Sequence, residues 1–324
     1  MPVLASAFRM AALKIIFMGT AELSCASLEK LAGDENFSIL AVVTHPDKPK
    51  GRELKLTPSP VKVLAEKLNL PVLQPLKARD ENFIAELREL KPELLIVVAY
   101  GQILPPSILD LPPFGCLNVH TSLLPKYRGA APIQWAIANG DAETGVTIMQ
   151  MDAGLDTGPV LSTRRTPILP ADDSQILHDR LAQLGAELLV ETIPDFVAGK
   201  MTPQPQPAAG STYAAKIKKD DGKIDWHQPA TQIWNRLRAF TPWPGAFTFL
   251  TAEPKPQLLK IWKAEVVEKS GPPGEVLTAD KTGIVVGCGN DGLRILELQR
   301  EGGKRMTSEH FLAGFPLKAG SQFV

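Results

Sequence analysis

The feature that most constrains this sequence is the alternation of strand and helix patterns through residues 1–200. The segment Leu94–Ala99 is almost entirely Leu, Ile and Val, which is typical of a strand covered on both faces. Similar β-rich segments recur between segments of helical character. We expect strands at 13–18, 39–44, 94–99, 115–120, 146–151 and 160–166, and helices from about 21 to 31 and at 59–67, 131–138 and 174–198.

This rhythm predicts an α/β fold with an open, Rossmann-like parallel sheet. In the second part a helix at 230–239 is followed, from residue 246, by short β-rich segments separated by turn residues, which favours a small β-barrel. Between the two parts lies Met201–Gly210, in which three prolines alternate with polar residues, a composition typical of an extended linker. We therefore predict a first domain at 1–200, a linker at 201–215 and a second domain at 216–324, as the length of 324 residues also suggests.

Charge is balanced overall but not along the chain. The 35 basic and 35 acidic side chains cancel, so no global field marks a nucleic-acid or membrane protein. Residues 1–209 carry 19 basic and 23 acidic side chains, a net of −4, whereas residues 210–324 carry 16 and 12, a net of +4. The smaller domain is thus the basic one.

Three dispersed cysteines without CxxC spacing exclude a disulfide scaffold and favour a reducing compartment. The N-terminus faintly resembles a signal peptide, but Lys14 interrupts its apolar stretch, and Met10 suggests that residues 1–9 are a dispensable extension. No apolar run is long enough to cross a bilayer. We expect a cytoplasmic protein, and because nothing in the sequence suggests a symmetric interface, a monomer.

Candidate chemistry begins at the end of the fourth expected strand. Asn118 and His120 flank one residue, so the alternation of a strand places both side chains on one face. Ligands of open parallel sheets gather at the carboxyl ends of strands. An amide donor beside an imidazole suits acyl transfer, because one group can hold an oxyanion while the other moves a proton. The same residues would also fit a purely structural strand-to-loop turn.

A second candidate patch is the glycine-flanked loop between the last two expected strands. It carries Asp152, which we interpret as part of a solvated turn, and Asp156, which lies between Gly154 and Gly158. A carboxylate held near a histidine can orient the ring and favour its protonated form. Asp156 is therefore the predicted partner of His120.

Together these motifs closely resemble the folate-dependent formyltransferases. The resemblance covers most of the chain from about Leu13, and its strength lies in the number of motifs in the same order. The motifs are Asn118–His120, Ser122–Pro125, Gly129–Gln134, Asp141–Asp152 and Gly154–Gly158, with Ser59–Lys62, Val97–Gly101, Lys223–Trp226 and Pro242–Pro244.

The resemblance implies transfer of a formyl group from 10-formyltetrahydrofolate to the α-amino group of methionine on initiator tRNA. It implies that Asn118, His120 and Asp156 form the catalytic trio. It also implies a folate-binding segment at Ser122, Leu123, Leu124 and Pro125. No metal is expected, since the reaction needs none and the sequence has no cysteine–histidine ligand cluster.

The resemblance also implies contacts with tRNA at two places. The polar segment 45–58 resembles an inserted loop that enters the acceptor stem, with Arg52 matching its prominent arginine. The second domain resembles an OB-like barrel that touches tRNA, where phosphate contacts would add affinity without reading sequence. The candidate tRNA-binding residues are Lys48, Lys50, Arg52, Lys55, Lys216, Lys218 and Lys219. A solvated loop and a structural appendage are the alternatives.

Two departures concern the first loop, where Ala21 and Leu23 replace a proline and an aromatic residue that the family usually has. Because of these two departures the sequence does not define the fine shape of the methionine or folate pocket, but they do not change the reaction that the resemblance implies. Gly19 begins no GxGxxG motif, so a dinucleotide-dependent dehydrogenase is excluded.

Two rival functions remain. One is a formyltransferase for a small amine such as glycinamide ribonucleotide or an amino sugar, or a formyltetrahydrofolate hydrolase. The other is a nucleic-acid-binding protein with a vestigial catalytic half.

Overall fold

The computed structural model describes residues 12–50, 55–251, 256–315 and 317–324, and the chain forms two compact units. The first unit comprises Met1–Arg128, Gly145–Arg165 and Asp179–Thr212. The second comprises Gly129–Thr144, Thr166–His178 and Tyr213–Val324. Neither unit is one continuous stretch of sequence, and the boundaries predicted at 1–200, 201–215 and 216–324 stay a prediction.

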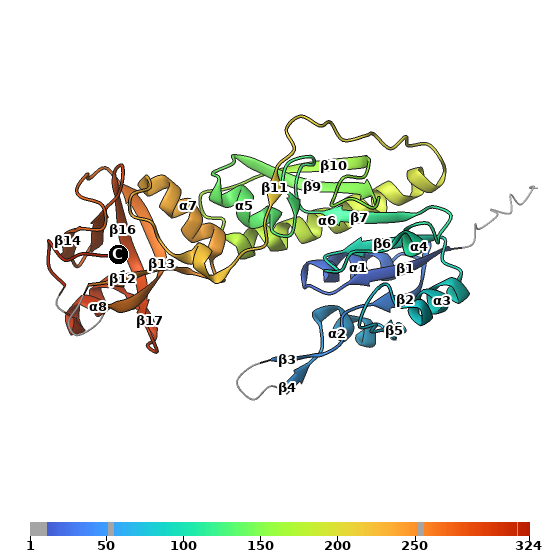
Figure 1. The fold of residues 1–324 in the computed structure, drawn as a ribbon, viewed down its shortest axis with the longest axis horizontal. Coiled ribbons are helices and arrows are strands. Elements are labelled where there is room, and N and C mark those ends of the chain that lie inside the picture. The colour runs from blue at the N-terminus through green and yellow to red at the C-terminus, as the bar shows by residue number, and fades with distance from the viewer. Residues whose placement is uncertain (1–11, 51–54, 252–255, 316) are drawn as a thin grey trace, which may run out of the picture. The chain divides into compact units, whose positions relative to one another are not determined.

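A seven-stranded sheet organises the first unit, in the order β10-β9-β7-β6-β1-β2-β5 (Figure 1). Its strands are β1 (Leu13–Gly19), β2 (Phe37–Val43), β5 (Val72–Leu73), β6 (Leu94–Val98), β7 (Cys116–His120), β9 (Glu143–Gln150) and β10 (Val160–Pro167).

The five strands from β7 to β5 pair in parallel, which confirms the predicted α/β class. β9 instead runs antiparallel to β7, so the complete sheet is mixed rather than wholly parallel. A parallel return would need a crossover helix packed on the sheet. The helix before β9, α5 (Pro132–Ala138), packs instead against α7 (Ala230–Phe240).

The two faces of β7 meet different helices. Val119 points toward α6 (Ser174–Val197), where a side chain on Gly185 would collide with it. Cys116 points the opposite way, and its thiol donates to carbonyls of α4 (Pro106–Leu109). By the alternation of a strand, Asn118 and His120 share the face of Cys116. That face belongs to a core cluster that includes Ile16, Leu95 and Cys116.

Three further helices belong to the first unit. They are α1 (Leu23–Ala32), α2 (Pro60–Lys67) and α3 (Glu81–Leu90). The Ser59 hydroxyl caps α2 by accepting from the Lys62 backbone N–H, and Pro60 occupies the first turn, where no intrahelical donor is lost. The sequence analysis did not predict α3, although Asp80 supplies its cap.

The polar segment after β2 is less irregular than predicted. It forms the two-stranded ribbon β3 (Lys48–Lys50) and β4 (Lys55–Thr57), whose register pairs Lys48 with Thr57. Residues 51–54 lie outside the described part of the chain. The prediction of a continuous loop over 45–58 is therefore wrong at residues 48–50 and 55–57, which form strands.

The second unit contains an antiparallel sheet in the order β12-β13-β16-β15-β14, with β17 paired to β16 (Figure 1). The strands are β12 (Ala246–Leu250), β13 (Gln257–Val267), β14 (Val276–Asp280), β15 (Gly283–Gly287), β16 (Gly292–Arg300) and β17 (Arg305–Thr307). The C-terminal residues bridge both edges, since Phe323 pairs with Leu250 and Gln322 with Glu275. Pairing at both edges is how a small sheet closes on itself, as the predicted barrel requires.

The remaining elements are short. They are β8 (Arg128–Gly129), β11 (Tyr213–Ala214), the 3-10 helix η1 (Lys219–Gly222) and α8 (Ser308–Gly314). None of the helices in the described ranges has the length and apolar character to span a membrane.

Candidate active site

His120 lies at the carboxyl end of β7 and is 6% exposed. Its Nε2 is 2.9 Å from the backbone carbonyl oxygen of Tyr127. A carbonyl can only accept, so Nε2 carries the proton in this contact. Nδ1 is then the nitrogen that gains or loses a proton, and it lies 3.8 Å from Oδ2 of Asp156.

Asn118 is also buried, at 9% exposure, and lies two residues before His120 on the same face. Its Nδ2 is 3.4 Å from Oδ1 of Asp156, a long hydrogen bond. The carboxylate of Asp156 thus uses one oxygen toward the amide and the other toward the imidazole. The structure brings Asn118, His120 and Asp156 together, as the sequence analysis predicted.

Both partners of His120 come from residues with a left-handed backbone. Tyr127 has φ +60° and Asp156 has φ +51°, a conformation that costs a non-glycine residue free energy, of order 1–3 kcal/mol. Such residues persist only where their surroundings hold them, and they cluster at functional sites. The backbone is therefore shaped to present a carbonyl and a carboxylate to the same ring.

Asp152 contributes to the shape of the Asp156 loop. Its Oδ1 accepts from the Gly154 N–H at 3.0 Å and from the Thr157 hydroxyl at 2.7 Å. Gly158 closes the loop, and a Cβ there would lie 1.9 Å from the Gln150 carbonyl oxygen. Asp152 is thus part of a turn, as interpreted from the sequence, and only Asp156 reaches the histidine.

The predicted folate segment Ser122–Pro125 follows His120 directly. The Ser122 hydroxyl donates to the Lys126 carbonyl at 2.6 Å, so it holds the loop. Thr147 of the neighbouring strand donates to the Ser122 carbonyl and accepts from the Leu124 N–H. Sequence reasoning did not single out Thr147. Leu123, Leu124 and Pro125 remain partly exposed at the same edge.

The same sheet edge carries another polar pair. His45 follows β2 and Tyr100 follows β6, and their rings meet edge to face with centroids 5.4 Å apart. His45 Nδ1 lies 3.4 Å from Lys48 Nζ, whereas His45 Nε2 and the Tyr100 hydroxyl are buried with no hydrogen-bond partner among the described residues. Desolvation and then the Lys48 charge lower the pKa of His45, and desolvation raises that of Tyr100 to about 12. Both groups are therefore neutral near pH 7.

The predicted tRNA-binding residues divide between the two units. Lys48 and Lys55 are exposed on the β3–β4 ribbon, as are Lys216, Lys218 and Lys219 in the second unit. The backbone of Lys50 belongs to β3. Arg52 lies outside the described residues.

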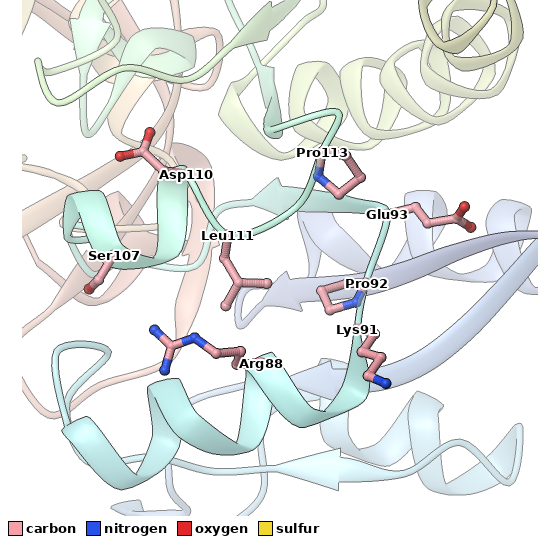
Figure 2. Close-up of a pocket in the computed structure, with 8 residues that line it drawn as sticks. All are labelled: Arg88, Lys91, Pro92, Glu93, Ser107, Asp110, Leu111 and Pro113. Carbon is pink, nitrogen blue, oxygen red and sulfur yellow. The ribbon is translucent and has the colours of Figure 1, made fainter.

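The opposite edge of the sheet has a surface hollow that contains none of the predicted site residues (Figure 2). Glu93 comes just before β6 and Pro113 comes before β7, so this hollow lies at the amino ends of the strands. Its charges are mixed, with Arg88 and Lys91 beside Glu93 and Asp110. Since ligands of such sheets bind at the carboxyl ends, we place no chemistry here.

Other chemistry finds little support in the part of the chain that the structure describes. Burial is the first cause that raises the pKa of Cys25 to about 11 and those of Cys116 and Cys288 to about 12. These thiols are protonated near neutral pH and poor nucleophiles. No group of three or more His, Cys, Asp or Glu side chains in the described ranges is arranged to hold a metal ion.

Comparison with known proteins agrees with the sequence motifs. The formyl transferase family matches residues 13–193, and the formyl transferase C-terminal domain matches residues 216–316. Methionyl-tRNA formyltransferase of Geobacter sulfurreducens is 51% identical over 313 residues, 97% of this chain and 97% of that protein. The protein of the same name from Caldanaerobacter subterraneus subsp. tengcongensis is 50% identical over 312 residues, 95% of this chain and 99% of that protein.

Solved structures share the fold at low identity. An N-formyltransferase from Helicobacter canadensis, in complex with folinic acid and dTDP-3-aminofucose, has a TM-score of 0.65 at 20% identity, covering 87% of this chain and 99% of its own. HypX from Aquifex aeolicus with tetrahydrofolic acid has a TM-score of 0.59 at 19% identity, covering 93% of this chain and 47% of its own. The family resemblance predicted from the motifs is therefore confirmed, and this chain belongs to the formyl transferase family.

Proposed function

We propose that the protein transfers the formyl group of 10-formyltetrahydrofolate to the α-amino group of methionyl initiator tRNA, in the cytoplasm. Relatives that are named for this activity are 50–52% identical in sequence over nearly the whole chain. The observation that carries the chemistry is one carboxylate, Asp156, that contacts an amide and an imidazole at the carboxyl edge of the sheet.

The proposed reaction begins with attack of the neutral amine on the formyl carbon. A carbon–nitrogen bond forms, and the formyl oxygen becomes an oxyanion. The Asn118 amide is an N–H donor suited to that oxyanion. The proton lost by the amine passes to Nδ1 of His120, because Nε2 is already committed to the Tyr127 carbonyl.

Collapse of the tetrahedral intermediate breaks the bond between the formyl carbon and N10 of the folate. The imidazolium of His120 returns its proton to N10, so the reaction balances without any other reactant. Asp156 stabilises the imidazolium while the proton resides there. The burial of His120 strengthens this charge interaction relative to water.

We propose that folate binds beside Ser122–Pro125. The relevant support is the position of this loop directly after His120 and the partly exposed side chains of Leu123, Leu124 and Pro125. The unpartnered polar atoms of His45 and Tyr100 add hydrogen-bonding capacity at the same sheet edge. We further propose that the exposed lysines of both units, together with Lys50 and Arg52, contact tRNA phosphates.

A direct comparison of acceptors tests the proposed function. Purified protein with radiolabelled 10-formyltetrahydrofolate is offered methionyl initiator tRNA, glycinamide ribonucleotide, a dTDP-linked amino sugar or water. We expect label only in the methionyl-tRNA. Preferred transfer to a small amine, or release of free formate, would support one of the rival enzymes instead.

A further inference from the structure

The linker after α6 makes an unexpected contact with the loop that carries Asp156. Gln206 is partly buried, although the residues on either side of it are exposed. Its Nε2 donates to the Asp156 carbonyl at 2.8 Å and to the Gly158 carbonyl at 2.7 Å. One amide nitrogen, 50 residues away in sequence, thus holds the backbone of the residue that supplies the carboxylate.

The other end of the same amide is fixed by Arg128. The Arg128 Nε and Nη2 donate to Gln206 Oε1 at 3.0 and 2.7 Å. Arginine can only donate and a carbonyl can only accept, so only one orientation of the amide satisfies all four contacts. A carboxylate at this position would keep the contact with Arg128 but would turn an oxygen toward two carbonyls.

These contacts meet a specific need of the site. Asp156 has a left-handed backbone, a conformation that a non-glycine residue keeps only where its surroundings hold it. Anchoring its carbonyl and that of Gly158 holds the loop at the strained residue and two residues after it. Because the carboxylate extends from this backbone, the anchor also sets the distance from Asp156 to His120.

A second contact from the linker reaches the other partner of His120. Thr212 accepts from the Tyr127 N–H at 2.8 Å through its hydroxyl and from the Arg128 N–H at 2.9 Å through its carbonyl. The linker therefore holds both left-handed residues that face the imidazole.

We propose that Gln206 is a positioning residue for Asp156, which makes the linker a structural part of the catalytic centre rather than a spacer. The effect of Gln206 on the rate of formyl transfer rests on the proposed function. Its effect on the order of the Asp156 loop rests on the hydrogen bonds alone. Gln206 touches no reacting atom. It acts through the backbone of Asp156.

The chain offers a matched control two residues away. Among the described residues, the Gln204 side chain donates only to the Thr202 carbonyl, and its backbone pairs with Val160 whatever its side chain is. Gln204→Ala therefore removes the same chemical group from the same linker without touching the Asp156 loop. Gln206→Glu tests the two ends of the Gln206 amide separately. It retains an oxygen that accepts from Arg128 but loses the N–H donor to the Asp156 and Gly158 carbonyls.

The first measurement is the single-turnover rate constant with enzyme in excess and both substrates saturating. This quantity does not depend on the fraction of enzyme that is folded. We expect Gln206→Ala and Gln206→Glu to be slower by about tenfold, as when two ordinary hydrogen bonds are lost, with unchanged Kd for tRNA and folate. Gln204→Ala should match the parent. A parental rate in Gln206→Ala, or in Gln206→Glu, overturns the proposal.

The second measurement is amide hydrogen exchange in a peptide that covers residues 152–158, which needs no activity. We expect faster exchange in both Gln206 variants and parental exchange in Gln204→Ala. Unchanged exchange in all three variants overturns the proposal. If the parent formylates no methionyl-tRNA, the proposed function fails, and exchange alone then decides whether Gln206 holds the loop.

Discussion

Two histidine–aspartate pairs in the described part of the chain share their residue types but differ in distance and in burial. His120 and Asp156 in the first unit are 3.8 Å apart, with side chains 7% and 15% exposed. His227 and Asp225 in the second unit are closer, at 3.2 Å, but are 83% and 56% exposed. The shorter distance belongs to the pair that we place outside any site.

The difference lies in what holds each pair. Asp225 and His227 are two residues apart in a turn, where Asp225 accepts from the His227 N–H and from the Gln228 amide. His120 and Asp156 come from a strand and a distant loop, and each has further partners that fix its orientation. An exposed ion pair contributes little, because water screens it and its side chains move. Burial and orientation, not distance, distinguish the pair that we propose to be catalytic.

The sharpest test replaces each histidine. His120→Ala should lower kcat by about 10²–10⁴-fold, the usual contribution of a positioned proton-transfer group. His227→Ala should leave kcat unchanged, because its side chain is exposed and, within the described residues, hydrogen-bonds to Asp225 alone. Steady-state kinetics with methionyl-tRNA measure both. Near-normal turnover in His120→Ala would refute the proton-transfer role, provided that folate and tRNA still bind.

Replacing each carboxylate should have a smaller effect. Asp156→Asn keeps the size of the side chain but removes the charge that faces Nδ1, and we expect kcat to fall about tenfold to a hundredfold. Asp225→Asn should change kcat by less than the error of the assay. If both variants behave alike, the arrangement around Asp156 has no catalytic consequence.

The smallest expected effect is on stability. Hydrogen bonds from Gln228 and then from the His227 backbone lower the pKa of Asp225 below its ordinary value. A lowered folded-state pKa means that Asp225 stabilises the protein above its unfolded-state pKa and that this contribution disappears as the pH falls through the folded-state pKa.

Asp225→Asn should therefore lower Tm slightly at pH 7, and this loss should shrink as the pH falls through the folded-state pKa, as thermal scans at pH 7 and at lower pH would measure. A larger loss at the lower pH would contradict this sign.

Much of the fold could be predicted from local sequence. The Leu94–Val98 strand is apolar throughout and buried along its whole length, which is the pattern of a strand covered on both faces. Ser59 and Pro60 predict the start of α2, because the capping hydroxyl of Ser59 and the fixed φ of Pro60 act locally. The antiparallel direction of β9 could not be predicted, because the alternation along a strand does not reveal how the connecting segment returns to the sheet.

The candidate site divides in the same way. Asn118 and His120 lie on one face because a strand alternates, and the sequence alone determined that. The sequence also singled out Asp156 as the partner of His120, but which ring nitrogen carries the proton and which one faces Asp156 depended on Tyr127 and Asp156 reaching the ring from separate loops. The sequence placed Gln206 in a proline-rich linker, where its neighbour Gln204 looks equivalent. Only tertiary structure distinguishes them, because hydrogen bonds between distant segments depend on how the chain packs in three dimensions.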